Sequence, residues 1–367
     1  MRKILTIFGT RPEAIKLAPV VKKISSFPQV FSSRVCVTAQ HREMLDQVLN
    51  IFDITPDYDL NIMKKAQSLT DINVNVMKKL TPILEKERPD VVIVQGDTTT
   101  TFAAALCAFS LRMAVAHVEA GLRTYDKFSP FPEEMNRKLT SCLTDFHFPP
   151  TQWSKQCLLK EGFPEDRIWV TGNTVIDALL DVTSRPYRFT DPRLEELSGR
   201  IILVTAHRRE SFGKPFEDLC NALKKIALEF KDATVIYPVH LNPNVRKPVQ
   251  SILQGIPNVW LTEPMEYEPF VHLMKKSTLI LTDSGGIQEE APSLGKPVLV
   301  MREKTERPEG IEAGTVRLVG TDTETIFKNT RSLLTDSAEY ERMSKAVNPY
   351  GDGHASERIA EVLEKHL

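Results

Sequence analysis

The chain has 367 residues, with 47 Lys and Arg against 48 Asp and Glu, so its formal net charge is −1. This length exceeds what one hydrophobic core usually holds, and we expect two domains of roughly 170 residues each. The balanced charge gives no general attraction to nucleic acid or to an acidic membrane. Any anion that the protein binds is therefore held by local groups.

Cysteine usage and the N-terminal stretch favour a cytoplasmic protein. The five cysteines are widely spaced and form no C-x-x-C pair, so they indicate neither a disulfide framework nor a zinc site. Met1-Arg2-Lys3 leads into an apolar stretch that ends at Gly9, which is too short for the core of a signal peptide. No apolar run is long enough to span a membrane. We expect no metal centre.

Short runs rich in Val and Ile, each followed by a helical pattern, are typical of βαβ units. In chain order they lie at residues 4–8, 35–38, 91–94 and 114–118, and then at 201–205, 234–237, 259–261, 279–281, 298–300 and 316–319. We predict an α/β protein with two Rossmann-like, doubly wound domains. Turn-forming residues near 183–192 place the boundary between residues 1–175 and 176–347, and residues 348–367 form a turn and a final amphipathic helix.

Polar residues follow the predicted strands, where open parallel sheets bind their ligands. Each could be an ordinary loop residue, but their recurrence in both halves indicates a ligand site. These positions are Gly9-Thr10-Arg11, Gln40-His41-Arg42, Gln95-Gly96-Asp97 and residues 117–121 in the first half, and residues 207–210, His240, Asp283-Ser284 and Arg302-Glu303 in the second.

The stretch from Leu279 to Val300 predicts a strand, a glycine turn, a helix start and a second strand. Its turn is Asp283-Ser284-Gly285-Gly286, where free backbone N–H groups and small residues would let a diphosphate approach. Glu289 and Glu290 follow at a distance suited to ribose hydroxyls. The alternative is an ordinary capped helix with solvated glutamates.

Cationic residues at two other strand ends also suit an anion. Arg11 and Lys16 flank the start of the first predicted helix, where a cation is costly unless an anion arrives. His207 and Arg208 follow a strand in the second half and add further donors. The alternatives are that Lys16 lies on an exposed helix face and that the arginines after His207 are solvated.

Four carboxylates lie at predicted loop positions of the first half, at Asp97, Glu119, Glu133 and Glu134. Such a cluster is what proton transfer at a sugar carbon requires, because a general base must reach the proton. Asp97 could instead cap the helix after it, and Glu133 could interact favourably with the dipole of a helix that begins after Pro132. Glu119, between a buried strand and a glycine, is harder to explain as a structural residue.

Seven motifs resemble the bacterial non-hydrolysing UDP-N-acetylglucosamine 2-epimerases and cover nearly the whole chain. They are FGTRPEAIKLAPVV from Phe8, QGDTTTT from Gln95, HVEAGLRT from His117, SPFPEEMNR from Ser129, TAHRRESFG from Thr205, TDSGGIQEEAP from Thr282 and NPYGDGHASERI from Asn348. The resemblance implies two Rossmann-like domains in the GT-B arrangement, with the active site in the interdomain cleft. It also implies a homodimer and a final helix that returns to the first domain.

The resemblance implies interconversion of UDP-N-acetylglucosamine (UDP-GlcNAc) and UDP-N-acetylmannosamine (UDP-ManNAc) through a 2-acetamidoglucal intermediate. No cofactor is expected, because the chain lacks the G-x-G-x-x-G pattern that would bring a nicotinamide. The catalytic positions matched are the carboxylates Asp97, Glu119 and Glu133 together with His207, which also faces the phosphates. The substrate-binding positions matched are Arg11, Ser284, Gly285, Gly286 and Arg307 for phosphate, Glu290 for ribose, Phe270 for uracil, and Lys16 and Arg137 in support.

Some family members also bind a second UDP-GlcNAc as an activator, and four positions match that pocket: Gln40, Glu43, Arg208 and His240. Ala66 stands where such relatives carry an arginine, and Met265 stands where a polar residue occurs beside uracil. Both differences weaken the match.

Three other functions share most of these residues. They are a hydrolysing epimerase that releases UDP and N-acetylmannosamine, a GT-B glycosyltransferase, and a UDP-sugar-binding regulator. The run from Arg11 to Lys16 resembles the non-hydrolysing branch more closely. Related epimerases accept diacetamido uronic acid derivatives, so the sugar itself is left open.

Overall fold

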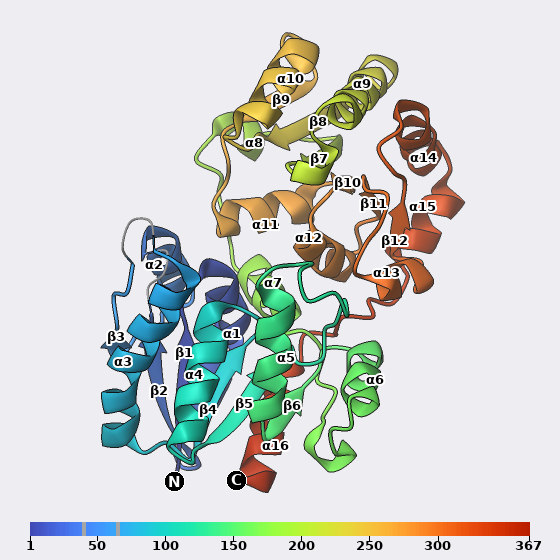
Figure 1. The fold of residues 1–367 in the computed structure, drawn as a ribbon. Coiled ribbons are helices and arrows are strands. Elements are labelled where there is room, and N and C mark those ends of the chain that lie inside the picture. Colours follow the sequence, from blue (N-terminus) through green and yellow to red (C-terminus); the bar gives the residue numbers. More distant parts are fainter. Residues whose placement is uncertain (39–41, 64–66) are drawn as a thin grey trace. The chain divides into compact units, whose positions relative to one another are not determined.

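The computed structural model describes residues 1–38, 42–63 and 67–367 and divides the chain into two compact units (Figure 1). The first unit contains Met1–Leu180 and Tyr350–Leu367, and the second contains Asp181–Pro349. The chain therefore crosses between units at 180/181 and 349/350, where the sequence predicted 175/176 and 347/348. Its last segment, predicted to return to the first domain, lies in the first unit.

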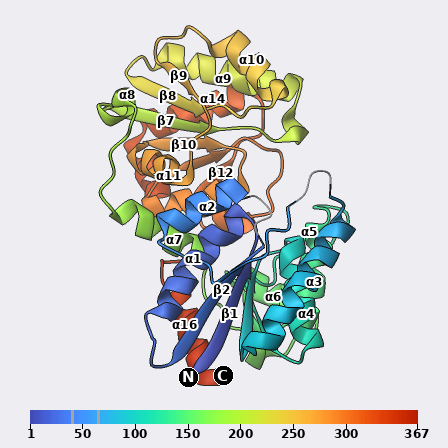
Figure 2. The ribbon, with the colours of Figure 1, turned by 90° about the vertical axis from the view of Figure 1, so that its left-hand side faces the viewer.

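The first unit is built on a six-stranded parallel sheet with the order β3-β2-β1-β4-β5-β6. Helices α3 and α4 cover one face through Val76, Leu80 and alanines of α4, and Figure 2 shows α1 and α16 on the other face. The strands are β1 (Arg2–Phe8), β2 (Phe31–Val37), β3 (Tyr58–Asp59), β4 (Val91–Gln95), β5 (Ala114–Val118) and β6 (Phe146–Phe148). The helices are α1 (Arg11–Ser25), α2 (Arg42–Ile51), α3 (Leu69–Glu87), α4 (Thr99–Ser110), α5 (Glu133–Leu143), α6 (Gln152–Lys160), η1 (Glu165–Arg167), α7 (Thr174–Ser184) and α16 (Ala355–His366).

The second unit repeats this plan with the order β12-β11-β10-β7-β8-β9, again all parallel. Its core packs Phe216, Val245 and Phe327 from three helices against the sheet. The strands are β7 (Arg200–Thr205), β8 (Ala233–Pro238), β9 (Val259–Thr262), β10 (Leu279–Thr282), β11 (Val298–Val300) and β12 (Val316–Leu318). The helices are α8 (Pro192–Glu195), η2 (Arg209–Ser211), α9 (Lys214–Glu229), α10 (Pro243–Leu253), α11 (Tyr267–Lys276), α12 (Gly285–Glu290), η3 (Ala291–Leu294), α13 (Pro308–Glu312), α14 (Thr323–Thr335) and α15 (Ser337–Ser344).

All ten strands predicted from apolar runs are present, which confirms two doubly wound, Rossmann-like domains. The strand order reverses next to β1 and β4 in the first unit, and next to β7 and β10 in the second. Ligands of such sheets bind beyond the carboxyl ends of the strands at this switch point. The loops that begin at Gly9, Gly96, Ala206 and Asp283 are therefore the four places to look for a site.

The final helix α16 is held in the first unit by residues of α1 and α7. Asp177 on α7 accepts hydrogen bonds from the backbone N–H of Ser356 (2.7 Å) and from its hydroxyl (2.6 Å). Lys23 of α1 forms an ion pair with Glu357 at 2.6 Å. The backbone N–H of Asn173, just before α7, also donates to the carbonyl of Tyr350 (2.7 Å), which ties the start of the last segment to the first unit.

No helix within residues 1–38, 42–63 and 67–367 is both long and apolar enough to cross a membrane.

Candidate functional site

One buried carboxylate, Glu13, ties together the two switch-point loops of the first unit. Its Oε2 accepts from the backbone N–H groups of Gly9 (3.1 Å) and Thr10 (2.7 Å), and its Oε1 accepts from the hydroxyls of Thr98 (2.7 Å) and Thr101 (3.1 Å). Burial raises the pKa of Glu13, and these hydrogen bonds oppose the rise. The loop that precedes Arg11 and the loop that contains Asp97 are thus fixed to each other. The sequence reasoning missed this role, although Thr10-x-x-Glu13 is a capping-box pattern that could have shown it.

Replacing Glu13 by glutamine is expected to keep this network, because the amide oxygen can face the two N–H groups and the NH₂ can face the two hydroxyls. The folded-state pKa of Glu13 is raised, so its stabilising contribution is complete below the usual value of 4.5 and is lost as pH rises through the folded value. Thermal melts between pH 4.5 and 8 should therefore show the variant gaining stability relative to wild type as pH rises.

A Glu13→Ala variant serves as the reference in the same melts. It leaves four donors without their acceptor and should lose ~3 kcal/mol or more. A wild-type protein that gained stability over Glu13→Gln with rising pH would contradict the assignment.

Glu119 is the most constrained carboxylate of the cluster. It follows β5 with a φ of 63°, a backbone conformation that non-glycine residues rarely adopt and that is concentrated at functional sites. Lys16 of α1 bonds to both carboxylate oxygens at 2.6 and 2.7 Å, and Gln95 donates to Oε2. The Lys16 side chain is only 16% exposed, so the alternative that it lies on an exposed helix face is wrong.

Asp97 follows β4 and is held by α5. Arg137 forms an ion pair with Asp97 Oδ2, and the side chain of Asn136 donates to the Asp97 carbonyl at 2.9 Å. Thr98, and not Asp97, is the N-cap of α4, because its hydroxyl accepts from the Thr101 N–H. The capping alternative for Asp97 is therefore wrong.

Glu133 and Arg11 both stand at helix starts. Glu133 is the first residue of α5, as predicted, and Arg11 is the first residue of α1, although we expected it in the preceding loop. Neither side chain has a hydrogen bond or ion pair to the residues described in the structure. No described residue therefore competes with a ligand for either side chain.

In the second unit, Asp283 ties the two switch-point loops together, as Glu13 does in the first. Asp283 is 1% exposed, and its Oδ2 accepts from the backbone N–H groups of His207 (2.6 Å) and Arg208 (2.7 Å). The His207 ring lies 3.6 Å from Asp283 Oδ1 and stacks on His240, with ring centroids 5.3 Å apart. Burial lowers the pKa of His207, and His240 and Arg208 lower it further, while Asp283 opposes them. A ring that is neutral at pH 7 can accept or donate a hydrogen bond beside an anion.

The glycine turn forms the predicted helix start, with Ser284 as the N-cap of α12 and no side-chain capping bond. The guanidinium of Arg307 lies so close to Gly285 that a Cβ there would be 2.5 Å from Nη1. Glu289 bonds to Arg307 Nε at 2.6 Å and is 5% exposed, so the alternative of solvated glutamates is wrong for Glu289. Glu289 thus positions Arg307, and Glu290 is left as the predicted ribose contact.

The remaining predicted residues are divided between described and undescribed parts of the chain. Phe270 is half-buried in the first half of α11, and Met265 lies just before that helix. Arg208 lies in the loop after β7 at the switch point of the second unit, and His240 follows β8 and stacks on His207. Gln40 and Ala66 lie outside the described residues, as does the side chain of Glu43.

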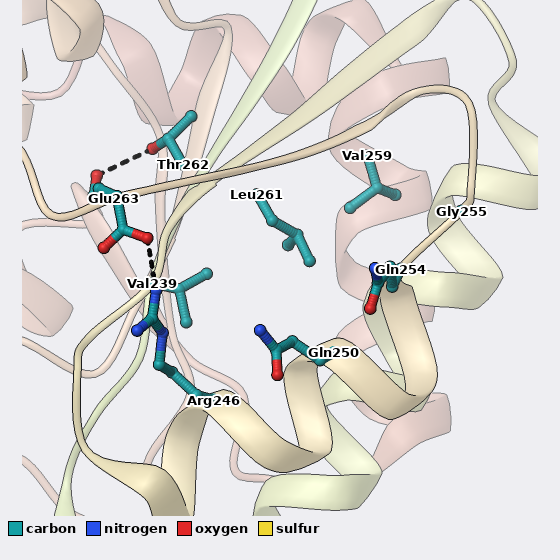
Figure 3. A pocket seen from close by; sticks show the side chains of 9 residues that line it. All are labelled: Val239, Arg246, Gln250, Gln254, Gly255, Val259, Leu261, Thr262 and Glu263. Atoms are coloured by element: carbon teal, nitrogen blue, oxygen red, sulfur yellow. Dashed lines mark hydrogen bonds and ion pairs between the residues drawn. The ribbon is translucent and has the colours of Figure 1, made fainter.

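A separate cavity of about 300 Å³ lies between α10 and β9 in the second unit (Figure 3). Arg246 and Glu263 form an ion pair at its wall, and Gln250 points toward it. None of the predicted site residues lines this cavity. We therefore do not assign it to the site.

Two Rossmann-like domains with charged, mutually braced loops at their switch points define a two-domain nucleotide-binding fold of the GT-B class. A family model described as UDP-N-acetylglucosamine 2-epimerase matches residues 24–364. The UDP-N-acetylglucosamine 2-epimerase of Escherichia coli (strain K12) is 57% identical, with 99% of both chains covered. The chain belongs to the UDP-N-acetylglucosamine 2-epimerase family.

Solved structures agree with this membership. The UDP-GlcNAc 2-epimerase of Neisseria meningitidis bound to UDP-GlcNAc is 52% identical, with a TM-score of 0.88 over 99% of this chain and 100% of that one. The S. aureus protein MnaA in a structure with UDP is 48% identical, with a TM-score of 0.88 over 100% and 97% of the two chains.

Proposed function

We propose that this protein is a non-hydrolysing UDP-GlcNAc 2-epimerase that interconverts UDP-GlcNAc and UDP-ManNAc. The observation that carries the proposal is the geometry of Glu119, which follows β5 beside the switch point of the first unit. Lys16 and Gln95 bind its carboxylate, and its backbone has a φ of 63°. A fixed carboxylate is what abstraction of a carbon-bound proton requires. The Neisseria relative, bound to UDP-GlcNAc, supports the choice of ligand.

The reaction proceeds by elimination and re-addition. A carboxylate takes the proton from carbon 2 while the bond between carbon 1 and the UDP oxygen breaks, and its electron pair leaves with UDP. The product is 2-acetamidoglucal. Protonation of carbon 2 from the opposite face and return of UDP to carbon 1 give the epimer. Asp97, Glu119 and Glu133 supply the proton-transfer groups.

The second unit supplies the groups that stabilise the departing UDP. Arg307, His207 and the Ser284-Gly285-Gly286 turn suit the diphosphate, because a guanidinium and backbone N–H groups form strong charge-assisted hydrogen bonds to phosphate oxygens. Glu290 suits the ribose and Phe270 suits the uracil. Arg11 of the first unit adds a cation that has no partner among the described residues.

The location and the assembly also belong to the proposal. The five cysteines all lie in the described part of the chain, none of them forms a disulfide there, and four of them are buried, which fits the reducing cytoplasm. A homodimer and a second, activating UDP-GlcNAc near Arg208 and His240 follow from the family resemblance. Sedimentation velocity tests the homodimer, and the dependence of the rate on UDP-GlcNAc concentration tests the activation. The UDP-ManNAc formed would supply N-acetylmannosamine units to a surface polysaccharide.

Proton NMR of the purified protein with UDP-GlcNAc in deuterium oxide tests the reaction itself. We expect UDP-ManNAc to appear with solvent deuterium at carbon 2. Accumulation of UDP and free N-acetylmannosamine would instead establish the hydrolysing reaction. Absence of both exchange and product would refute epimerisation and favour a transferase, another UDP-sugar, or binding alone.

A further inference from the structure

Glu134 lies next to the proposed proton-transfer residue Glu133 but points into the protein. Its side chain is 3% exposed. The two carboxylate oxygens accept hydrogen bonds from the backbone N–H groups of Thr124 (3.0 Å) and Tyr125 (2.9 Å). Tyr125 has a φ of 62°, which a tyrosine adopts only when its surroundings hold it. Glu134 therefore fixes the turn at residues 124–125.

The same carboxylate contacts Arg137, one turn later on α5. Arg137 Nη1 lies 3.4 Å from Glu134 Oε2, and its Nη2 forms the ion pair with Asp97. The Nε of Arg137 is buried and has no hydrogen-bond partner among the described residues. Within that part of the structure, the orientation of this guanidinium depends on its two carboxylates. The guanidinium of Arg137 thus interacts with the carboxylates of both Asp97 and Glu134.

We propose that Glu134 is a positioning residue that sets the orientation and the charge environment of Asp97 through Arg137. This inference rests on the proposed function, in which Asp97 takes part in proton transfer. Because Arg137 is shared, the negative charge of Glu134 offsets part of the attraction that Arg137 exerts on ionised Asp97. Removing that charge leaves the full cation to Asp97, whose ionised form is then favoured down to lower pH.

Other charged and titratable groups surround this end of the sheet. They are Glu13 and Lys16 on α1, His117 on β5, Glu119 and Arg123 after β5, and Glu133 at the start of α5. Burial lowers the pKa of His117 to about 4, so its ring is neutral near pH 7. Substitution of Glu134 leaves all of these groups in place. Glutamine can accept only one of the two backbone N–H bonds from Thr124 and Tyr125, so a lower rate alone would also follow from a loosened turn. A shift of the profile along the pH axis is therefore the readout that reports on the shared Arg137.

The test compares kcat/KM as a function of pH for wild type, Glu134→Gln and Glu134→Asp. Glutamine removes the charge at constant length, and we expect kcat to fall roughly tenfold with KM within twofold. Any acidic limb of the profile that depends on Asp97 should move to lower pH, because the negative charge that shares Arg137 with Asp97 has been removed. Aspartate keeps the charge and alters the reach, so its rate should fall while the limb stays in place.

Glu161→Gln is the matched control. Glu161 pairs at 2.9 Å with Arg123, another buried arginine of the first unit, and neither residue contacts Asp97. This variant should leave the limb at its wild-type pH. The proposal is overturned if Glu134→Gln leaves both rate and limb unchanged, or lowers the rate at every pH without moving the limb. Loss of the proposed function would show in the wild-type profile, whereas failure of the Glu134 proposal would show only in the variants.

Discussion

Replacing Glu119 by glutamine is expected to reduce epimerisation of UDP-GlcNAc by about a thousandfold, the size of a lost general base. The glutamine keeps the shape of the side chain but cannot take a proton, and it cannot pair with Lys16 through both oxygens as Glu119 does at 2.6 and 2.7 Å. Turnover followed by NMR, with deuterium incorporation at carbon 2, measures the effect. UDP affinity should stay within a few-fold of wild type, because the residues that we propose for the diphosphate, apart from Arg11, lie in the second unit.

Glu357→Gln is the control for this experiment. It breaks a lysine–glutamate pair of the same length, with Lys23 at 2.6 Å, in the same unit. This pair is more exposed and lies between α1 and α16, so turnover should remain near the wild-type value. If Glu119→Gln kept more than a tenth of the wild-type rate, Glu119 would not be an obligatory proton carrier.

Replacing Arg307 by methionine is expected to weaken UDP binding by roughly 10- to 100-fold, since one or two charge-assisted hydrogen bonds to phosphate are lost. Isothermal titration calorimetry with UDP measures this directly. The substitution also leaves Glu289 buried without its 2.6 Å partner, which should cost about 3 kcal/mol of stability. The double variant Arg307→Met with Glu289→Gln removes that buried charge, and it should recover stability without recovering affinity.

Arg317→Met is the matched control for binding. Arg317 lies in the same unit and pairs with Glu339 and Asn329, away from the glycine turn. It should bind UDP as wild type does. Undiminished affinity in Arg307→Met would show that Arg307 does not hold the diphosphate.

The strands and loops that position the site could be predicted because each depends on local sequence. Buried parallel strands appear as short runs of Val and Ile, and the residues after them lie at the ligand-binding edge. Strands β3 and β6 were missed, because Tyr58–Asp59 has two residues and Phe146–Phe148 has three, and neither contains Val or Ile. Their pairing depends on the neighbouring strands β2 and β5.

The partners of the charged residues could not be predicted, because they come from distant parts of the chain. Lys16 and Glu119 are 103 positions apart, and only the parallel order of β1, β4 and β5 brings them together. The polarity of a residue also does not reveal whether its side chain faces the protein or the solvent. Glu289 and Glu290 are adjacent in sequence, yet Glu289 is buried against Arg307. The resemblance to the epimerases predicted candidate site residues, but it did not reveal that Glu13 and Asp283 brace the loops.

The pairing of α16 with α1 and α7 has a consequence for biosynthesis. The second unit is one uninterrupted stretch, Asp181–Pro349, inserted into a first unit that needs residues from both ends of the chain. On the ribosome, all residues of the second unit are available before Tyr350–Leu367 has been made. Domains usually fold in order from the N-terminus during synthesis. Here the unit that begins first is completed last, when the final helix reaches Asp177 and Lys23.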